Sequence, residues 1–313
     1  MLYWFIPTVI AASALLLSLG VMLVCFFTIF YSPRKKKKRK SGNPIPSHRI
    51  YDPYRTQLID WIHEVRELPH SDHSITSFDG LRLFGSYYEF KKGAPVEILL
   101  HGYRGNSLRD MSGGVIRCRE LGHNAFLVDH RASGKSEGRV ITFGVKESLD
   151  CVAWVNYFVE KIDPDAKIIL TGLSMGASTV LTAASMPLPE NVVGILADCG
   201  FSSTREIVQK VMRDRGLPAR FLYPFARLSA ILFGGFDPDQ TSAKESMKRT
   251  SLPVLFFHGD ADDFVPHSMS RQNYEACASE KKRLILTPGA GHALCFPIDR
   301  DAYVQAMREF FEE

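Results

Sequence analysis

The first thirty residues of this sequence carry no charge. No Asp, Glu, Lys or Arg occurs between Leu2 and Tyr31, and about 20 apolar residues suffice to cross the hydrocarbon core of a bilayer. A cleaved signal peptide has its positive charge before the apolar run and small residues after it. In this sequence the charge follows the run, so we interpret residues 1–32 as an uncleaved transmembrane anchor.

The net positive charge of the chain comes from one short segment. The chain has a net charge of +4, and residues 34–40 alone contain seven Lys and Arg, so the remainder is slightly acidic. This balance argues against a nucleic-acid-binding groove. Since Lys and Arg next to a membrane span stay on the cytoplasmic side, the expected location is the cell membrane, single-pass, with the following domain in the cytosol.

Closely spaced cysteines are also missing. The six cysteines are scattered, with no Cys-x-x-Cys pair, so a cysteine-based metal site is not indicated, and a chain of this size needs no disulfide framework. We expect buried, reduced thiols.

The remainder of the chain divides into a linker and one large domain. Residues 33–55 combine the basic segment with several prolines and a glycine, as a juxtamembrane linker does. In residues 56–313, Asp79-Gly80 predicts a hairpin, and short apolar runs then alternate with helical stretches. This alternation predicts an α/β domain with a mostly parallel sheet flanked by helices. The predicted strands after the hairpin are 96–100, 125–128, 167–170, 192–197, 253–257 and 283–286.

Residues 200–248 interrupt this alternation. They are rich in Phe, Leu and Arg and have a helical pattern. An insertion at this point would lie over the carboxyl ends of the strands, where open α/β sheets bind ligands. We interpret the segment as a candidate helical lid; the alternative is that its aromatic residues form core beneath a cap.

A Gly-x-Ser-x-Gly motif is centred on Ser174. A buried apolar strand precedes it, and small residues that begin a helix follow it. A sharp strand-to-helix turn projects a serine hydroxyl into a cleft, and the helix start supplies backbone N–H groups for a developing oxyanion. The motif alone is weak, but its position between a strand and a helix makes Ser174 a candidate nucleophile.

A nucleophilic serine needs a base, and the base needs a group that orients it. The strand at 253–257 is followed by three acids within four residues, Asp260, Asp262 and Asp263. The next strand leads to His292, so an acid and a histidine follow successive strands. Asp198, at the end of the strand 192–197, is a further candidate for the acid.

The loop after the strand 96–100 is His-Gly-Tyr-Arg-Gly-Asn, beginning at His101. The backbone N–H of Tyr103 is placed to pair with that of Met175, directly after Ser174, as an oxyanion hole.

Taken together, these motifs resemble the serine α/β-hydrolases, in particular the group that includes membrane-tethered bacterial esterases and serine-aminopeptidase-like hydrolases. The resemblance covers about residues 74–312. It rests on the His-Gly loop at 101, the segment 129–138 (Asp-His-Arg-Ala-Ser-Gly-Lys-Ser-Glu-Gly), the Ser174 motif, His-Gly-x-x-Asp-x-x-Val-Pro at 258–266 and Gly-x-Gly-His-Ala at 289–293. It implies the α/β-hydrolase fold, with Ser174 as nucleophile, Asp262 as acid, His292 as base, and Tyr103 and Met175 as oxyanion donors. The family often has Arg-Gly-x-Gly where this chain has Ala132 in the second position.

The expected chemistry is a two-step acyl transfer that needs no metal or organic cofactor. An anchored enzyme with an apolar, arginine-bearing lid would suit an amphiphilic acyl ester near the bilayer, with the membrane contacted through residues 2–31. Three alternatives stay open at this stage: an aminopeptidase-like amidase, an acyltransferase, and a non-catalytic scaffold on the same fold.

Overall fold

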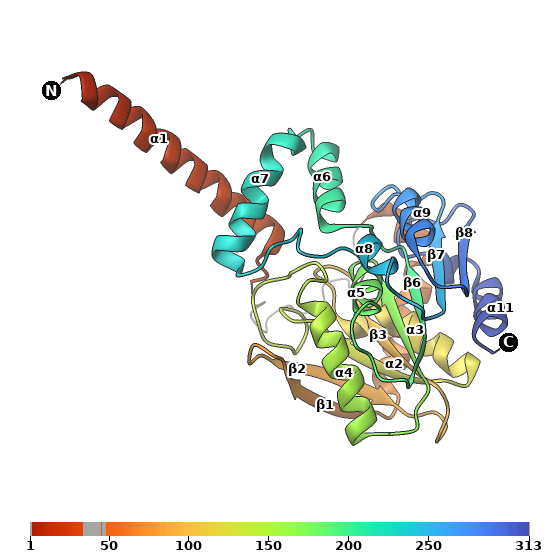
Figure 1. The fold of residues 1–313 in the computed structure, drawn as a ribbon. Coiled ribbons are helices and arrows are strands. Elements are labelled where there is room, and N and C mark those ends of the chain that lie inside the picture. Colours follow the sequence, from red (N-terminus) through yellow and green to blue (C-terminus); the bar gives the residue numbers. More distant parts are fainter. Residues whose placement is uncertain (1, 34–44, 46–47, 313) are drawn as a thin grey trace.

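A central sheet of eight strands organises the part of the chain that the computed structural model describes, residues 2–33, 45 and 48–312 (Figure 1). The predicted basic cluster at 34–40 lies outside these residues. The sheet order is β1-β2-β4-β3-β5-β6-β7-β8. β1 and β2 form the predicted antiparallel hairpin, β2 pairs with β4 antiparallel, and all other pairs are parallel. The strands are β1 (Ser71–Thr76), β2 (Arg82–Tyr88), β3 (Val96–Leu100), β4 (Asn124–Asp129), β5 (Ile168–Leu173), β6 (Val192–Asp198), β7 (Val254–Gly259) and β8 (Lys282–Thr287).

Helices cover both faces of the sheet. One face packs against α4 (Glu147–Lys161), α5 (Met175–Ala183), α8 (Ala243–Met247) and α9 (His267–Ala276). The other face packs against α2 (Arg55–Glu67), α3 (Ser107–Leu121), α10 (Cys295–Ile298) and α11 (Arg300–Phe311). Because both faces are covered, every residue of β3 and β4 is buried, which explains why these strands are mainly apolar and do not alternate between apolar and polar residues. The predicted α/β-hydrolase fold is confirmed.

The segment 200–248 is helical, as predicted. It contains α6 (Thr204–Asp214), α7 (Ala219–Ser229), the short π-helix η3 (Ala230–Gly234) and α8. The segment follows the carboxyl end of β6, and α6 and α7 stand over that edge of the sheet (Figure 1).

The apolar N-terminus forms a single long helix, α1 (Leu2–Cys25), which continues as a short π-helix, η1 (Phe26–Phe30). Residues Ile6–Phe30 are long and apolar enough to cross a membrane, as either an anchor or a signal sequence would be. Figure 1 shows α1 projecting away from the domain, with its last turns beside α7.

All six cysteines are buried and free, as expected.

Candidate active site

Ser174 lies on the tight turn that joins β5 to α5. Its backbone has φ 57° and ψ −114°, a strained conformation for a residue with a side chain, costing about 1–3 kcal/mol. The turn is possible because glycine flanks it two residues away on each side. A Cβ on Gly172 would lie 2.2 Å from the carbonyl oxygen of Gly176, and a Cβ on Gly176 would lie 2.0 Å from that of Leu100. The Gly-x-Ser-x-Gly spacing therefore follows from packing.

The structure brings Ser174, His292 and Asp262 together in one hydrogen-bonded chain. The Ser174 hydroxyl is 3.0 Å from Nε2 of His292, and Nδ1 of the same ring is 2.7 Å from Oδ2 of Asp262. The three side chains come from the ends of β5, β8 and β7, and all three are buried. Parallel strands place their carboxyl ends at one edge of the sheet, which explains how residues 118 positions apart in the sequence meet.

The Asp262 carboxylate is held by several donors. Its Oδ1 accepts hydrogen bonds from the backbone N–H of Phe264 at 3.0 Å and of Val265 at 2.8 Å. Nε2 of His258 lies 3.3 Å from Oδ2. Burial alone would raise the pKa of Asp262, but the hydrogen bonds from His258 and His292 lower it below its ordinary value. The carboxylate is therefore ionised and fixed in orientation.

The other acids on the predicted list have different partners. Asp260 accepts a hydrogen bond from the backbone N–H of Gly289 at 2.6 Å, and the backbone carbonyl of Asp263 accepts one from Lys210. Asp198 accepts one from the Tyr303 hydroxyl at 3.1 Å, and burial raises its pKa. Only Asp262, among the described candidates, is hydrogen-bonded to His292.

The loop that carries Tyr103 lies against the serine. A Cβ built on Gly102 would lie 3.6 Å from Cβ of Ser174. No acceptor in the described part of the chain takes a hydrogen bond from the backbone N–H of Tyr103 or of Met175. The loop before Tyr103 thus lies against Ser174, Met175 follows Ser174 directly, and both N–H groups are available; the role of Tyr103 and Met175 as oxyanion donors stays a prediction.

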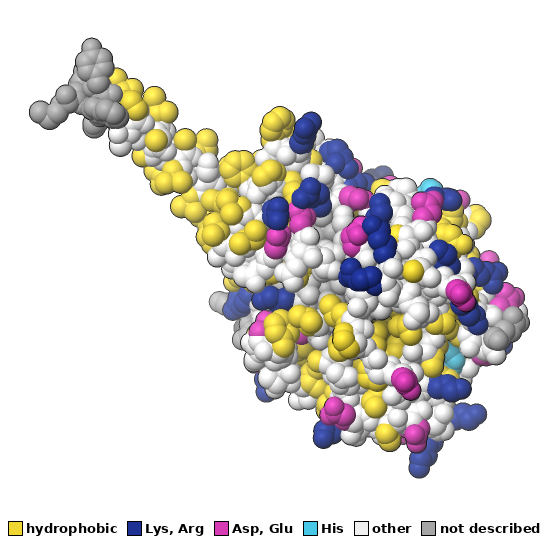
Figure 2. Space-filling view, viewed as in Figure 1, with side chains coloured by type: hydrophobic (Ala, Val, Ile, Leu, Met, Phe, Trp, Pro, Cys, Tyr) yellow, Lys and Arg dark blue, Asp and Glu magenta, His cyan; other side chains and the backbone are white. Residues whose placement is uncertain are grey.

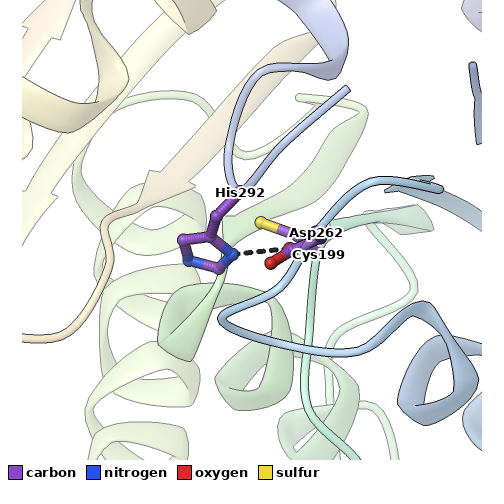
Figure 3. Close-up of side chains that lie close together, drawn as sticks. All are labelled: Cys199, Asp262 and His292. Atoms are coloured by element: carbon purple, nitrogen blue, oxygen red, sulfur yellow. Dashed lines mark hydrogen bonds and ion pairs between the residues drawn. The ribbon is translucent and has the colours of Figure 1, made fainter. Parts of the chain in front are cut away.

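Cys199 lies beside this chain of hydrogen bonds, as Figure 3 shows, and its Sγ, with one atom each of Asp262 and His292, falls in a group within 4.8 Å. A metal ion would need the thiolate, whereas burial raises the pKa of the Cys199 thiol well above its ordinary value. The Asp262 carboxylate and Nδ1 of His292 are also bonded to each other. These residues fit a hydrogen-bonded site better than a metal centre.

One element near the site had no counterpart in the sequence analysis. Residues Arg49–Tyr54, within the segment expected to be a linker, form a short 3-10 helix, η2. A Cβ on Gly291, the neighbour of His292, would lie 3.3 Å from the Ile50 side chain. Burial raises the pKa of the Tyr51 phenol, with Asp262 among the charges that act on it. In the sequence, the one indication that this segment packs against the domain is a group of three large apolar or aromatic side chains, Ile50, Tyr51 and Tyr54.

Comparisons with known proteins agree with the fold. Residues 95–237 match a family model described as the alpha/beta hydrolase fold, and residues 237–299 match one described as serine aminopeptidase, S33. The uncharacterised protein YqkD of Bacillus subtilis is 29% identical over 216 residues, which cover 69% of this chain and 70% of YqkD. Protein bem46 of Schizosaccharomyces pombe is 24% identical over 227 residues, covering 72% and 70%. Among solved structures, the esterase Pf2001 of Pyrococcus furiosus superimposes with a TM-score of 0.66 at 20% identity, covering 90% of this chain and 97% of the esterase.

Proposed function

We propose that this chain, which has the α/β-hydrolase fold, is a membrane-anchored serine hydrolase that cleaves a carboxylic ester. The observation that carries this proposal is the hydrogen-bonded chain of Ser174, His292 and Asp262. A serine, a histidine and a buried ionised carboxylate in this order form the arrangement that activates a serine hydroxyl.

In the proposed first step, Oγ of Ser174 attacks the ester carbonyl while Nε2 of His292 takes the hydroxyl proton. Asp262 accepts a hydrogen bond from Nδ1–H, which holds the tautomer that leaves Nε2 free to accept, and stabilises the imidazolium. The negative charge that develops on the carbonyl oxygen is stabilised by the N–H groups of Tyr103 and Met175; one such donor is worth about 10²–10³ in rate.

The tetrahedral intermediate then collapses. The C–O bond to the alcohol breaks, and the proton on His292 passes to the departing alkoxide, leaving an acyl ester on Ser174. A water molecule, deprotonated by His292, attacks this ester, and the carboxylic acid is released with the proton returned to Ser174. No step requires a redox partner or a second substrate besides water.

The apolar surroundings of Ser174 favour a substrate with an apolar acyl chain over a substrate with a charged one. Met175 belongs to an apolar cluster that includes Phe201 and Val265, with Tyr103 and Phe143 packed against it. Phe264, which is partly exposed, has its ring 5.0 Å from the ring of His292. Together with α1 as a membrane anchor, this apolar setting supports an amphiphilic ester as the substrate. The basic residues 34–40 that follow the apolar run favour the cytoplasmic side for the domain.

A second candidate is an aminopeptidase-like amidase, because the match to the serine aminopeptidase model includes both Asp262 and His292. The two candidates are separated by comparing p-nitrophenyl esters of increasing chain length with aminoacyl-arylamides, with Ser174→Ala as the control. We expect ester turnover that is lost in the variant. Faster turnover of the arylamides would favour the amidase, and turnover that survives in Ser174→Ala would refute the serine mechanism.

A further inference from the structure

The C-terminal end of the N-terminal helix is hydrogen-bonded to the catalytic domain and packs against it. The hydroxyl of Tyr103 donates to the carbonyl of Ile29 at 2.6 Å. The Arg104 guanidinium donates to the carbonyls of Thr28 and Tyr31, each at 2.9 Å. These bonds satisfy carbonyls at the C-terminal end of the apolar helix, which lack partners within the helix itself.

Side-chain packing fixes the same junction. Phe30 is fully buried, with its ring 5.8 Å from that of Phe143 and 5.4 Å from that of Phe236. The backbone N–H of Ile141 donates to the carbonyl of Phe30 at 2.8 Å. The last turns of the helix are therefore packed against the catalytic domain and against the lid, through Phe236 and through contacts with α7 and η3, so the position of the helix in a membrane sets the position of the lid.

The length of the free part of α1 gives the depth of the lid. The large apolar side chains from Ile6 to Leu19 are exposed, whereas burial against the domain begins at Met22. About 20 residues at 1.5 Å each span the hydrocarbon core of about 30 Å, which the stretch from Leu2 to residue 21 supplies. With this placement, residues 22–30 would lie at the boundary between acyl chains and headgroups, and α7 packs beside the end of α1 and η1.

The outer face of α7 has the pattern of a helix that lies in this boundary. Phe221, Pro224 and Leu228 of α7 and Ile231 of η3 recur at intervals of three or four and are all exposed, Phe221 by 74%. They form a stripe on the side opposite the buried Tyr223. Leu232 and Phe233 of η3 are also exposed, and the ring of Phe233 is 5.7 Å from that of Phe26.

The apolar stripe is continuous with the anchor and bordered by positive charge. Figure 2 shows hydrophobic side chains running from α1 onto the lid, with Lys and Arg beside them. Arg213, Arg215 and Arg220 are exposed, and none forms an ion pair within the described part of the chain. In a bilayer with anionic headgroups, the exposed apolar side chains can insert at the boundary between headgroups and acyl chains, and the unpaired arginines beside them can bind the headgroups.

We propose that the outer face of α7 and η3 is a second membrane contact, which inserts the lid into the headgroup region of the bilayer and holds the mouth of the active site at the lipid surface. This second contact rests on the proposed function only through the premise that α1 spans a membrane, and it does not depend on catalysis. It implies that substrate enters from the lipid phase.

The test places an environment-sensitive fluorophore (NBD) on single introduced cysteines of the full chain in anionic vesicles, with and without brominated lipids. All six native cysteines are buried, so the introduced thiol is the reactive one. The test position is Phe221→Cys. Ile10→Cys in α1 is the positive control, and Val193→Cys, exposed at the amino end of β6 on the sheet edge opposite the lid, is the matched control in water.

We expect blue-shifted emission at position 221, quenched by bromine but more weakly than at position 10 because an interfacial helix lies at a shallower depth, and no quenching at position 193. Water-like emission at 221 with strong quenching at 10 overturns the lid contact but leaves the anchor intact. Blue-shifted emission at 221 without bromine quenching overturns it in favour of a protein partner, such as a second copy of the chain. Water-like emission at position 10 overturns both, and esterase activity still reports separately on the catalytic proposal.

Discussion

Replacing Asp262 with asparagine tests the most specific feature of the site, the link between carboxylate orientation and histidine tautomer. In the native structure Oδ1 of Asp262 accepts from Phe264 N–H and Val265 N–H, and Oδ2 faces His292. Asparagine has one oxygen and one NH₂ group, so these two environments compete for the single acceptor. The outcome can be worked out from the donors on each side.

The two backbone donors decide the orientation. Turning the NH₂ group toward Phe264 and Val265 would leave two N–H groups without acceptors, at about 1–3 kcal/mol each. The opposite orientation loses only the weaker contact with Nε2 of His258, which is 3.3 Å away. The asparagine oxygen therefore stays with the backbone, and its NH₂ group faces His292. Nδ1 must then accept, the proton moves to Nε2, and the ring can no longer take a proton from Ser174.

We expect kcat for ester hydrolysis to fall about 10⁴-fold, as the same change does in another serine hydrolase, with KM and folding nearly unchanged. The assay is steady-state hydrolysis of p-nitrophenyl acetate at neutral pH, with circular dichroism as a check of the fold. Asp198→Asn is the matched control, because Asp198 is also a buried carboxylate at a strand end but is bonded to Tyr303. A loss of less than about tenfold in a folded Asp262→Asn variant, or a larger loss in Asp198→Asn, would refute the reasoning.

Three further predictions concern stability. Ala132 has φ 61°, a left-handed conformation that costs a residue with a side chain about 1–2 kcal/mol. Glycine avoids this cost but loses more backbone entropy on folding, so Ala132→Gly should raise the free energy of unfolding in urea by about 0.5–1 kcal/mol. An unchanged or lower free energy of unfolding would contradict this. Gly176→Ala should prevent correct folding because the added Cβ would lie 2.0 Å from the Leu100 carbonyl oxygen. Gly102→Ala should fold, because a Cβ there would have no contact under 3.5 Å. Equal yields of folded protein from the two variants would contradict this packing argument. Because the pKa of Asp262 lies below 3.8, its stabilising contribution is present above that pH and is lost as the pH falls below it. Urea unfolding between about pH 5 and pH 3 should therefore show a smaller loss of stability in Asp262→Asn than in the wild type, and parallel curves would argue against it.

The fold was predictable from local patterns because each pattern has a local physical cause. Buried parallel strands are mainly apolar along their length, and the order of such runs and helical stretches defines the layered architecture. The turn at Ser174 was recognisable because only glycine fits at 172 and 176. Spacing alone does not show which of Asp260 and Asp262 is the acid of the site, since both lie on one short turn. They differ in the backbone N–H groups from which their carboxylates accept hydrogen bonds.

Contacts between distant segments were not predictable in this way. Nothing in the sequence around Ile50 indicates that it packs beside Gly291. The apolar run at the N-terminus likewise gives the length of a membrane span but not the hydrogen bonds from Tyr103 and Arg104 to its last carbonyls. Such contacts depend on the assembled tertiary structure, because the groups involved are about 75 or more residues apart.

The central claim, that Ser174 is an activated nucleophile, is tested most directly by labelling with a fluorophosphonate probe. The wild-type chain and Ser174→Ala are purified in the same detergent and treated with the probe side by side. The account predicts covalent labelling of the wild type, blocked in Ser174→Ala and strongly slowed in Asp262→Asn. Equal labelling of wild type and Ser174→Ala, or a folded wild type that does not react, would contradict it.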